Sequence, residues 1–177
     1  MRTNSGEDIT SSSLLRLIKQ AGPVDFTFRT PAEIGDLACF LAELCPTPET
    51  ATVGLIELMA NAIEHGVLCI GHETKLHLRR NMSLEDEVDR RLALDKYAGL
   101  IAHIEVSLVG DKINFKVSDP GQGFDWHPFE NFNHDRAADP CGRGIAIART
   151  MGFESVEFIG CGNQVVAKIS LPTDKNL

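Results

Sequence analysis

The chain has 177 residues, of which 43% are hydrophobic and 24% are charged, and its formal net charge is -8 at pH 7. This length and composition are typical of one soluble globular domain that buries a substantial core. The negative charge argues against a nucleic-acid-binding surface, which requires clustered Lys and Arg side chains, but it leaves nucleotide binding open.

The sequence has none of the patterns that direct a chain to a membrane. Residues 1–13 are polar and lack the basic stretch and apolar run of a signal peptide, and no apolar run approaches the roughly 18 residues that span a bilayer. The five cysteines are scattered without a C-x-x-C pair, which favours reduced thiols. We therefore expect a cytoplasmic protein that contacts neither membranes nor nucleic acid.

The first third of the chain alternates helical and strand-like patterns. Thr30 followed by Pro31 is typical of a helix start, because proline fits the first helical turn. The hydrophobic periodicity predicts a short helix over 9–20, a strand over 24–29 and a helix over 31–44. We interpret residues 1–22 as an N-terminal extension and residues 23–177 as the main domain.

The next predicted helix, over residues 49–65, has one apolar and one polar side. Its buried face is predicted to consist of Leu55, Leu58, Met59 and Ala62, and its polar side of Glu57, Asn61, Glu64 and His65. Gly66 is expected to end the helix as a C-terminal cap. Because positions i and i+4 share a helix face, Glu57 and Asn61 can serve one site. Taken alone, the polar stripe is more simply interpreted as a solvated helix face.

Residues 70–99 are rich in charged side chains, and residues 83–94 within them have a helical pattern. We interpret this stretch as a charged helical insertion, either a passive surface element or a surface for a partner. Four strands with alternating apolar residues follow, at about 104–108, 113–117, 155–158 and 165–171. Together the elements predict an α+β, two-layer α/β sandwich, with helices on one face of a mixed, mostly antiparallel sheet.

Two further segments have residue types suited to a ligand site. In Val117-Ser-Asp119-Pro-Gly121-Gln-Gly123, an aspartate ends a strand and two glycines follow, which lets a ligand approach the backbone. An ordinary Asp-Pro-Gly turn explains this segment equally well in isolation. In Gly142-Arg143-Gly144, glycines open an apolar helix whose N-terminus can face a phosphate, although a tight helix entry gives the same pattern.

The order of these three segments resembles the GHKL family of ATP-binding proteins, which includes gyrase, Hsp90-type chaperones, histidine kinases and MutL-type ATPases. The resemblance covers about residues 24–172 and implies the Bergerat form of the sandwich. Within that family the chain looks most like the bacterial anti-sigma Ser/Thr kinases. The run Glu57-Leu-Met-Ala-Asn61-Ala-Ile-Glu-His65-Gly66 carries this narrower likeness.

The resemblance implies ATP and Mg²⁺ as cofactors and gives each matched residue a role. By this likeness Glu57 is the general base, Asn61 binds Mg²⁺, Asp119 binds the adenine amine, and Gly121 and Gly123 shape the pocket. Gly142, Arg143 and Gly144 are expected to meet the phosphates, and residues 125–141 to form an ATP lid with Arg136 as a phosphate contact. The last hairpin, Gly162-Asn163-Gln164-Val165, departs from the family, many of whose members have a threonine near there.

The function that this likeness implies is a kinase that phosphorylates or sequesters a protein partner, of the sigma-factor or antagonist type, in a bacterial partner-switching pathway. The alternative is a non-catalytic, nucleotide-gated protein-binding module. A homodimer is left open. The catalytic half of a histidine kinase is disfavoured, because roughly two dozen residues precede the first strand, too few for a helical hairpin with a phosphoaccepting histidine.

Overall fold

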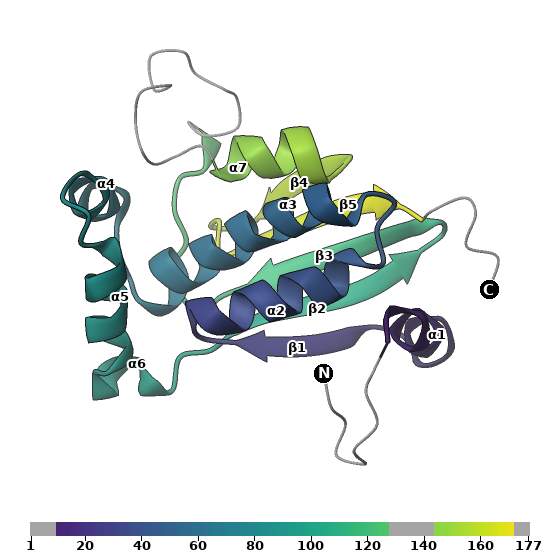
Figure 1. The fold of residues 1–177 in the computed structure, drawn as a ribbon, viewed down its shortest axis with the longest axis horizontal. Coiled ribbons are helices and arrows are strands. Elements are labelled where there is room, and N and C mark those ends of the chain that lie inside the picture. The colour runs from purple at the N-terminus through teal and green to yellow at the C-terminus, as the bar shows by residue number, and fades with distance from the viewer. Residues whose placement is uncertain (1–9, 128–143, 172–177) are drawn as a thin grey trace.

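The computed structural model describes residues 10–127 and 144–171, in which helices pack on one face of a five-stranded sheet (Figure 1). The strands lie in the order β1-β2-β3-β5-β4. Their bounds are β1 Val24–Phe28, β2 Ala102–Val109, β3 Lys112–Ser118, β4 Ser155–Ile159 and β5 Gln164–Ser170. All four pairings are antiparallel. The α+β class is confirmed, whereas the predicted mixed character of the sheet is wrong for the described strands.

The strands form where the sequence alternates, because successive side chains point to opposite faces of a sheet. Phe26 is paired with Ile104, and Val106 with Phe115, so that apolar side chains line up across one face. These four side chains are buried, whereas Glu105 and its partner Lys116 lie on the opposite, partly exposed face. The apolar face forms the floor of the core.

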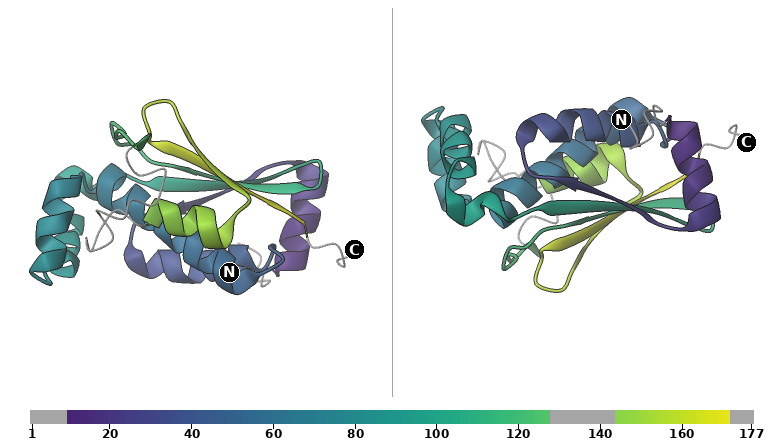
Figure 2. Two further views of the ribbon diagram at one scale, coloured as in Figure 1. Left: turned by 90° about the horizontal axis from the view of Figure 1, so that it is seen from above. Right: turned by 90° about the horizontal axis from the view of Figure 1, so that it is seen from below.

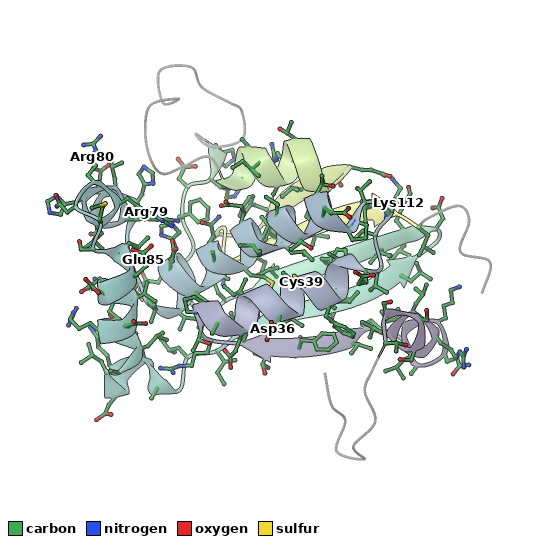
Figure 3. All side chains as sticks on the ribbon, viewed as in Figure 1. Asp36, Cys39, Arg79, Arg80, Glu85 and Lys112 are labelled. Atoms are coloured by element: carbon green, nitrogen blue, oxygen red, sulfur yellow. The ribbon has the colours of Figure 1, made fainter. Side chains whose placement is uncertain are left out.

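Helices α2 (Pro31–Ala42) and α3 (Pro48–Asn61) cover that floor, as the two edge-on views show (Figure 2). The Thr30 side chain accepts the Glu33 amide while the Glu33 carboxylate accepts the Thr30 amide, so the start of α2 is capped. The predicted buried face of α3 is confirmed. Asp36 and Cys39 lie on the exposed side of α2 (Figure 3).

The helix that contains Glu57 and Asn61 does not end at Gly66, which corrects the prediction. It continues from α3 as a π-helical segment, Ala62–Val67, with Gly66 inside it. Gly66 does not have the positive φ of a C-terminal cap. A glycine occurs here for a different reason, which is the close approach of another part of the chain.

Helix α1 (Ser11–Ala21) contributes Leu14, Leu15 and Ile18 to the hydrophobic core. The segment interpreted as an extension therefore packs with the rest of the molecule. At the other end of the chain, the short helix α7 (Gly144–Ile147) and the π-helical turn Ala148–Gly152 lie beside α3. Residues 1–9, at the start of the predicted extension, lie outside the described part of the chain.

The charged stretch predicted as helical forms three short helices at one side of the molecule (Figures 1 and 2). They are α4 (His72–Arg80), α5 (Leu84–Leu92) and α6 (Asp95–Ala98). Arg79 and Glu85 form an exposed ion pair between α4 and α5, 3.5 Å long (Figure 3). Leu84, Val88 and Tyr97 are buried and join this segment to the core.

No single helix in the described residues is long and apolar enough to cross a membrane. Residues 48–67 and 72–80 pass such a test only as a pair, and they are bent by 112° relative to each other.

Candidate functional site

A cavity open to solvent lies between the C-terminal half of the α3 helix and the ends of strands β3, β4 and β5, and its space is about 410 Å³ when the open solvent at its mouth is included. It brings together two of the three segments that the sequence singles out. Asn61, His65 and Gly66 come from the helix, and Asp119 and Gly123 come from the loop after β3. The remaining lining residues are Leu58, Ala62, Val117, Phe124, Phe158, Gly162, Asn163, Gln164 and Val165.

Asp119 is the ionisable acid of this cavity, and it follows β3 directly. Its Oδ1 accepts the backbone N–H of Gly121 at 2.8 Å, which closes a tight turn. Burial raises the pKa of the Asp119 carboxyl to about 6, against a smaller opposing effect of the Gly121 hydrogen bond. Within residues 10–127 and 144–171 its other oxygen, Oδ2, has no hydrogen-bond partner. A half-buried carboxylate with a spare acceptor oxygen is suited to a ligand that donates a hydrogen bond.

Glycines make room for this carboxylate on two sides. A Cβ on residue 66 would lie 2.1 Å from Asp119 Cγ, and a Cβ on residue 121 would lie 2.8 Å from both Asp119 Oδ1 and the Cα of Gly66. Real Cβ contacts are essentially never so short, so any larger residue would force the helix and the turn apart. The carboxylate therefore lies between two glycine backbones, at the wall of the cavity.

Asn163 is a site residue that the sequence analysis noted only as a departure from a family pattern. Its side-chain Nδ2 donates to the backbone carbonyls of Asp119 at 3.2 Å and Gly121 at 3.3 Å, and its backbone carbonyl accepts the Asp119 N–H. Asn163 thus ties the β4–β5 turn to the turn after β3. An asparagine in a glycine-rich turn often bonds nearby backbone, which is the signal that could have identified it.

The loop after β3 and the β4–β5 turn are also in close backbone contact at Gly123 and Gly162. Gly123 has φ +78°, and a Cβ there would lie 2.0 Å from the carbonyl oxygen of Cys161. The neighbouring Phe124 N–H donates to that same carbonyl. Gly162 is equally restricted, because a Cβ there would lie 2.4 Å from the Phe124 carbonyl oxygen. The predicted importance of Gly123 is therefore a matter of close backbone packing at the cavity wall.

Aromatic rings form another wall of the cavity. The Phe124 ring packs edge-on against Phe158 with 5.6 Å between centroids, and it stacks with the His65 imidazole at 6.1 Å. Trp126 also stacks with Phe158, with 5.4 Å between the ring centroids. Such a wall favours a flat, apolar ligand group.

His65 is held in one tautomer by the backbone. Its Nδ1 lies 2.5 Å from the Ile70 carbonyl, which can only accept, so Nδ1 carries the proton. Burial is the main cause that lowers the His65 pKa, and the positive charge of Lys75 lowers it further. The imidazole therefore faces the cavity as a neutral group near pH 7.

Glu57 and Asn61 share one helix face as predicted, but they do not have the same surroundings. Asn61 lines the cavity, whereas Glu57 lies one turn earlier in α3, against the start of α7. A Cβ on residue 144 would lie 2.3 Å from Glu57 Oε2. Gly144, the described residue of the third sequence segment, thus lies next to Glu57, which is half-buried.

Three of the predicted site residues, Arg136, Gly142 and Arg143, lie outside the described residues, as does most of the predicted lid at 125–141. Comparison with known proteins adds no assignment: no protein-family model matches the chain, and no curated protein matches it.

Proposed function

We propose that this protein binds an adenine nucleotide in the cavity beside Asp119 and is an ATP-dependent protein Ser/Thr kinase of the GHKL type. One observation carries the proposal. A half-buried carboxylate, one oxygen of which accepts no hydrogen bond from the described residues, lies between the glycine backbones of residues 66 and 121, in a cavity walled by aromatic and aliphatic side chains.

The cavity fits the chemistry of an adenine base. A purine has flat apolar faces and an exocyclic amine that donates hydrogen bonds. Phe124, Phe158 and Val165 offer surfaces for the faces, and Asp119 offers the acceptor. Glycines at the wall let a flat ring approach the backbone closely.

Asn61 fits the chemistry of a magnesium ligand. Mg²⁺ is usually held by one or two protein oxygens together with substrate phosphates and water, rather than by a dedicated protein cage. The described residues contain no group of three or more His, Cys, Asp or Glu side chains that could hold a metal. A single amide oxygen on the cavity wall matches the first of these two arrangements.

In this proposal ATP, when bound, supplies the phosphoryl group, and the chain's own residues orient and deprotonate the acceptor. Glu57 lies one turn from Asn61 on the same helix face, which suits a base that accepts the hydroxyl proton of a partner's Ser or Thr. We propose the cytoplasm as its location, where ATP is available, and a protein of the sigma-factor or antagonist type as its partner.

The experiment that tests the activity compares Glu57→Ala with Asn61→Ala in the presence of ATP, Mg²⁺ and candidate protein partners. Glu57→Ala should retain nucleotide and partner binding but lose phosphorylation about a hundred-fold or more, because a general base acts mainly in the transition state. Asn61→Ala should weaken Mg-nucleotide binding and phosphorylation together. A wild-type protein that sequesters partners without phosphorylating any would instead be a nucleotide-gated binding module.

A further inference from the structure

Lys75 reaches from the charged insertion to the helix that lines the cavity. Its Nζ forms an ion pair with Glu64 Oε2 and donates to Asn61 Oδ1 at 3.4 Å. Only 13% of the Lys75 side chain and 11% of the Glu64 side chain are exposed. A long, flexible side chain is buried here at an entropic cost, so the contact is a fixed feature of the fold rather than a passing surface pair.

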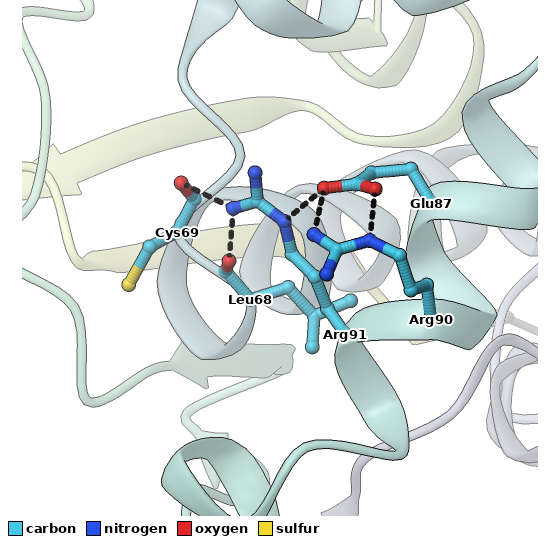
Figure 4. A network of polar contacts seen from close by, with 5 residues as sticks. All are labelled: Leu68, Cys69, Glu87, Arg90 and Arg91. Atoms are coloured by element: carbon cyan, nitrogen blue, oxygen red, sulfur yellow. Dashed lines mark hydrogen bonds and ion pairs between the residues drawn. The ribbon is translucent and has the colours of Figure 1, made fainter.

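An arginine also fixes the insertion close to the same helix. Arg91 of α5 donates to the carbonyls of Leu68 at 2.7 Å and Cys69 at 3.0 Å, directly after the π-helical segment (Figure 4). Glu87 accepts from Arg91 Nε at 2.7 Å and orients the guanidinium. Because these anchors hold α5 by backbone carbonyls, α4 and its Lys75 have a defined position beside Asn61.

Arg29 holds the far end of the insertion in the same way. Its guanidinium donates to the carbonyls of Leu92 at 2.9 Å and Tyr97 at 3.3 Å. Of these three basic anchors, Lys75 is the one that contacts a cavity-lining residue.

The charged groups around the cavity suggest a role for Lys75 in binding an anionic ligand. No Lys or Arg is among the described residues that line the cavity, whereas Asp119 is a lining acid. A polyphosphate carries several negative charges and is repelled by uncompensated carboxylates. Lys75 donates to Asn61, a residue that lines the cavity, and its positive charge also lowers the pKa of His65, another lining residue.

We infer that Lys75 is a further binding residue of this site, which attracts the phosphate tail of a nucleoside di- or triphosphate and holds the Asn61 amide. The inference rests on the proposed nucleotide site. It gives the insertion a direct role in ligand binding, which goes beyond the passive or partner-binding roles expected from its sequence. The alternative is a purely structural role, in which Lys75 only neutralises the buried Glu64.

The double variant Glu64→Gln/Lys75→Met separates these two roles, because it removes both charges and leaves no buried carboxylate unpaired. Lys75→Met alone leaves Glu64 buried without its cation, and this variant is expected to lose thermal stability. Lys96→Met is the matched control, since Lys96 is an exposed lysine on the same insertion, packed over the Tyr97 ring.

The measurement is the binding affinity of each variant for two ligands. Affinity for Mg-ADP is measured by isothermal titration calorimetry, and affinity for adenosine by NMR titration. The double variant should regain thermal stability, yet bind Mg-ADP at least tenfold more weakly than wild type and adenosine within twofold of wild type. Lys96→Met should match wild type for both ligands. Wild-type affinity for Mg-ADP in the double variant, or an equal loss for adenosine, overturns the inference alone. Absence of Mg-ADP binding by wild type overturns the proposed function and the inference with it.

Discussion

The backbone of Gly66 lies directly against the Asp119 carboxylate, so closely that a Cβ on residue 66 would be 2.1 Å from Asp119 Cγ and Oδ1. The two residues are more than fifty positions apart in the sequence. Their contact joins the helix of Asn61 to the turn after β3, and it defines one wall of the cavity. The site therefore depends on the absence of a side chain at position 66.

Gly66→Ala should damage both the fold and the site. The added methyl must displace the Asp119 carboxylate or the helix, and overpacking of this kind costs about 1–3 kcal/mol. Urea denaturation should show that loss, and the variant should have no measurable nucleotide affinity.

Gly35→Ala is the matched control, because Gly35 lies within α2 and its Cβ would meet no atom within 4 Å. It should stabilise the helix by up to about 1 kcal/mol. If Gly66→Ala were as stable as Gly35→Ala, the described contact between Gly66 and Asp119 would be wrong.

Asp119→Asn should raise the stability of the ligand-free protein at neutral pH. The pKa of Asp119 is about 6 in the folded chain and about 3.9 in an unfolded one, so the native state binds the proton more tightly. This group's contribution to stability therefore decreases as pH rises from about 4 to 6 and stays reduced above that range. The asparagine has no charge to desolvate and escapes this penalty.

Thermal denaturation across the pH range checks this sign. The melting temperature of Asp119→Asn should exceed that of wild type at pH 7.5, and the difference should shrink towards pH 4. Asp36→Asn changes an exposed carboxylate on α2 and should show no such trend (Figure 3). A difference that grows on acidification would contradict the assignment.

Asn163→Ala should weaken nucleotide binding without unfolding the protein. It removes the two hydrogen bonds that the side chain donates to the carbonyls of Asp119 and Gly121, each worth about 0.5–1.5 kcal/mol. The turn would hold the carboxylate less rigidly. Titration calorimetry should show a lower affinity for Mg-ADP, while the circular dichroism spectrum stays that of wild type. Unchanged affinity for Mg-ADP would mean that the Asn163 hydrogen bonds are not needed to position Asp119.

Arg91→Met and Arg90→Met form a matched pair on α5. Both arginines bond Glu87, but only Arg91 also donates to the carbonyls of Leu68 and Cys69. Arg91→Met should therefore cost about 1–3 kcal/mol of stability, whereas loss of the more exposed Arg90 should cost clearly less, because solvent screens an exposed ion pair. Equal losses in urea denaturation would show that the Leu68 and Cys69 contacts add nothing.

The regular elements could be predicted from the sequence because their signals are local. Alternation predicts β1 to β5, and the Thr30-Pro31 pair predicts the start of α2. Local signals failed at Gly66, which resembles a helix cap but is a glycine because a distant carboxylate packs on it. The pattern cannot show a contact made across fifty residues.

In the site too, residues with local sequence signals could be predicted, whereas residues that act through distant contacts could not. Asn61 and Asp119 line the same cavity, as the order of the sequence motifs predicted. The roles of Asn163 and Lys75 depend on tertiary contacts between loops and insertion, and no spacing rule indicates them. Glu64 was expected on the polar helix side with the site residues, yet it is buried, because Lys75 of the insertion covers and neutralises it.

Isothermal titration of the wild-type protein and Asp119→Asn with ADP at pH 7.5, with and without Mg²⁺, tests the central claim most directly. Wild type should bind Mg-ADP with a single site per chain and bind more weakly when magnesium is chelated. Asp119→Asn, although folded and more stable, should bind at least tenfold more weakly, because its side-chain amide lacks the carboxylate's charge and spare acceptor. No heat of binding by wild type at millimolar nucleotide, or equal affinities of the two proteins, would contradict an adenine site at Asp119.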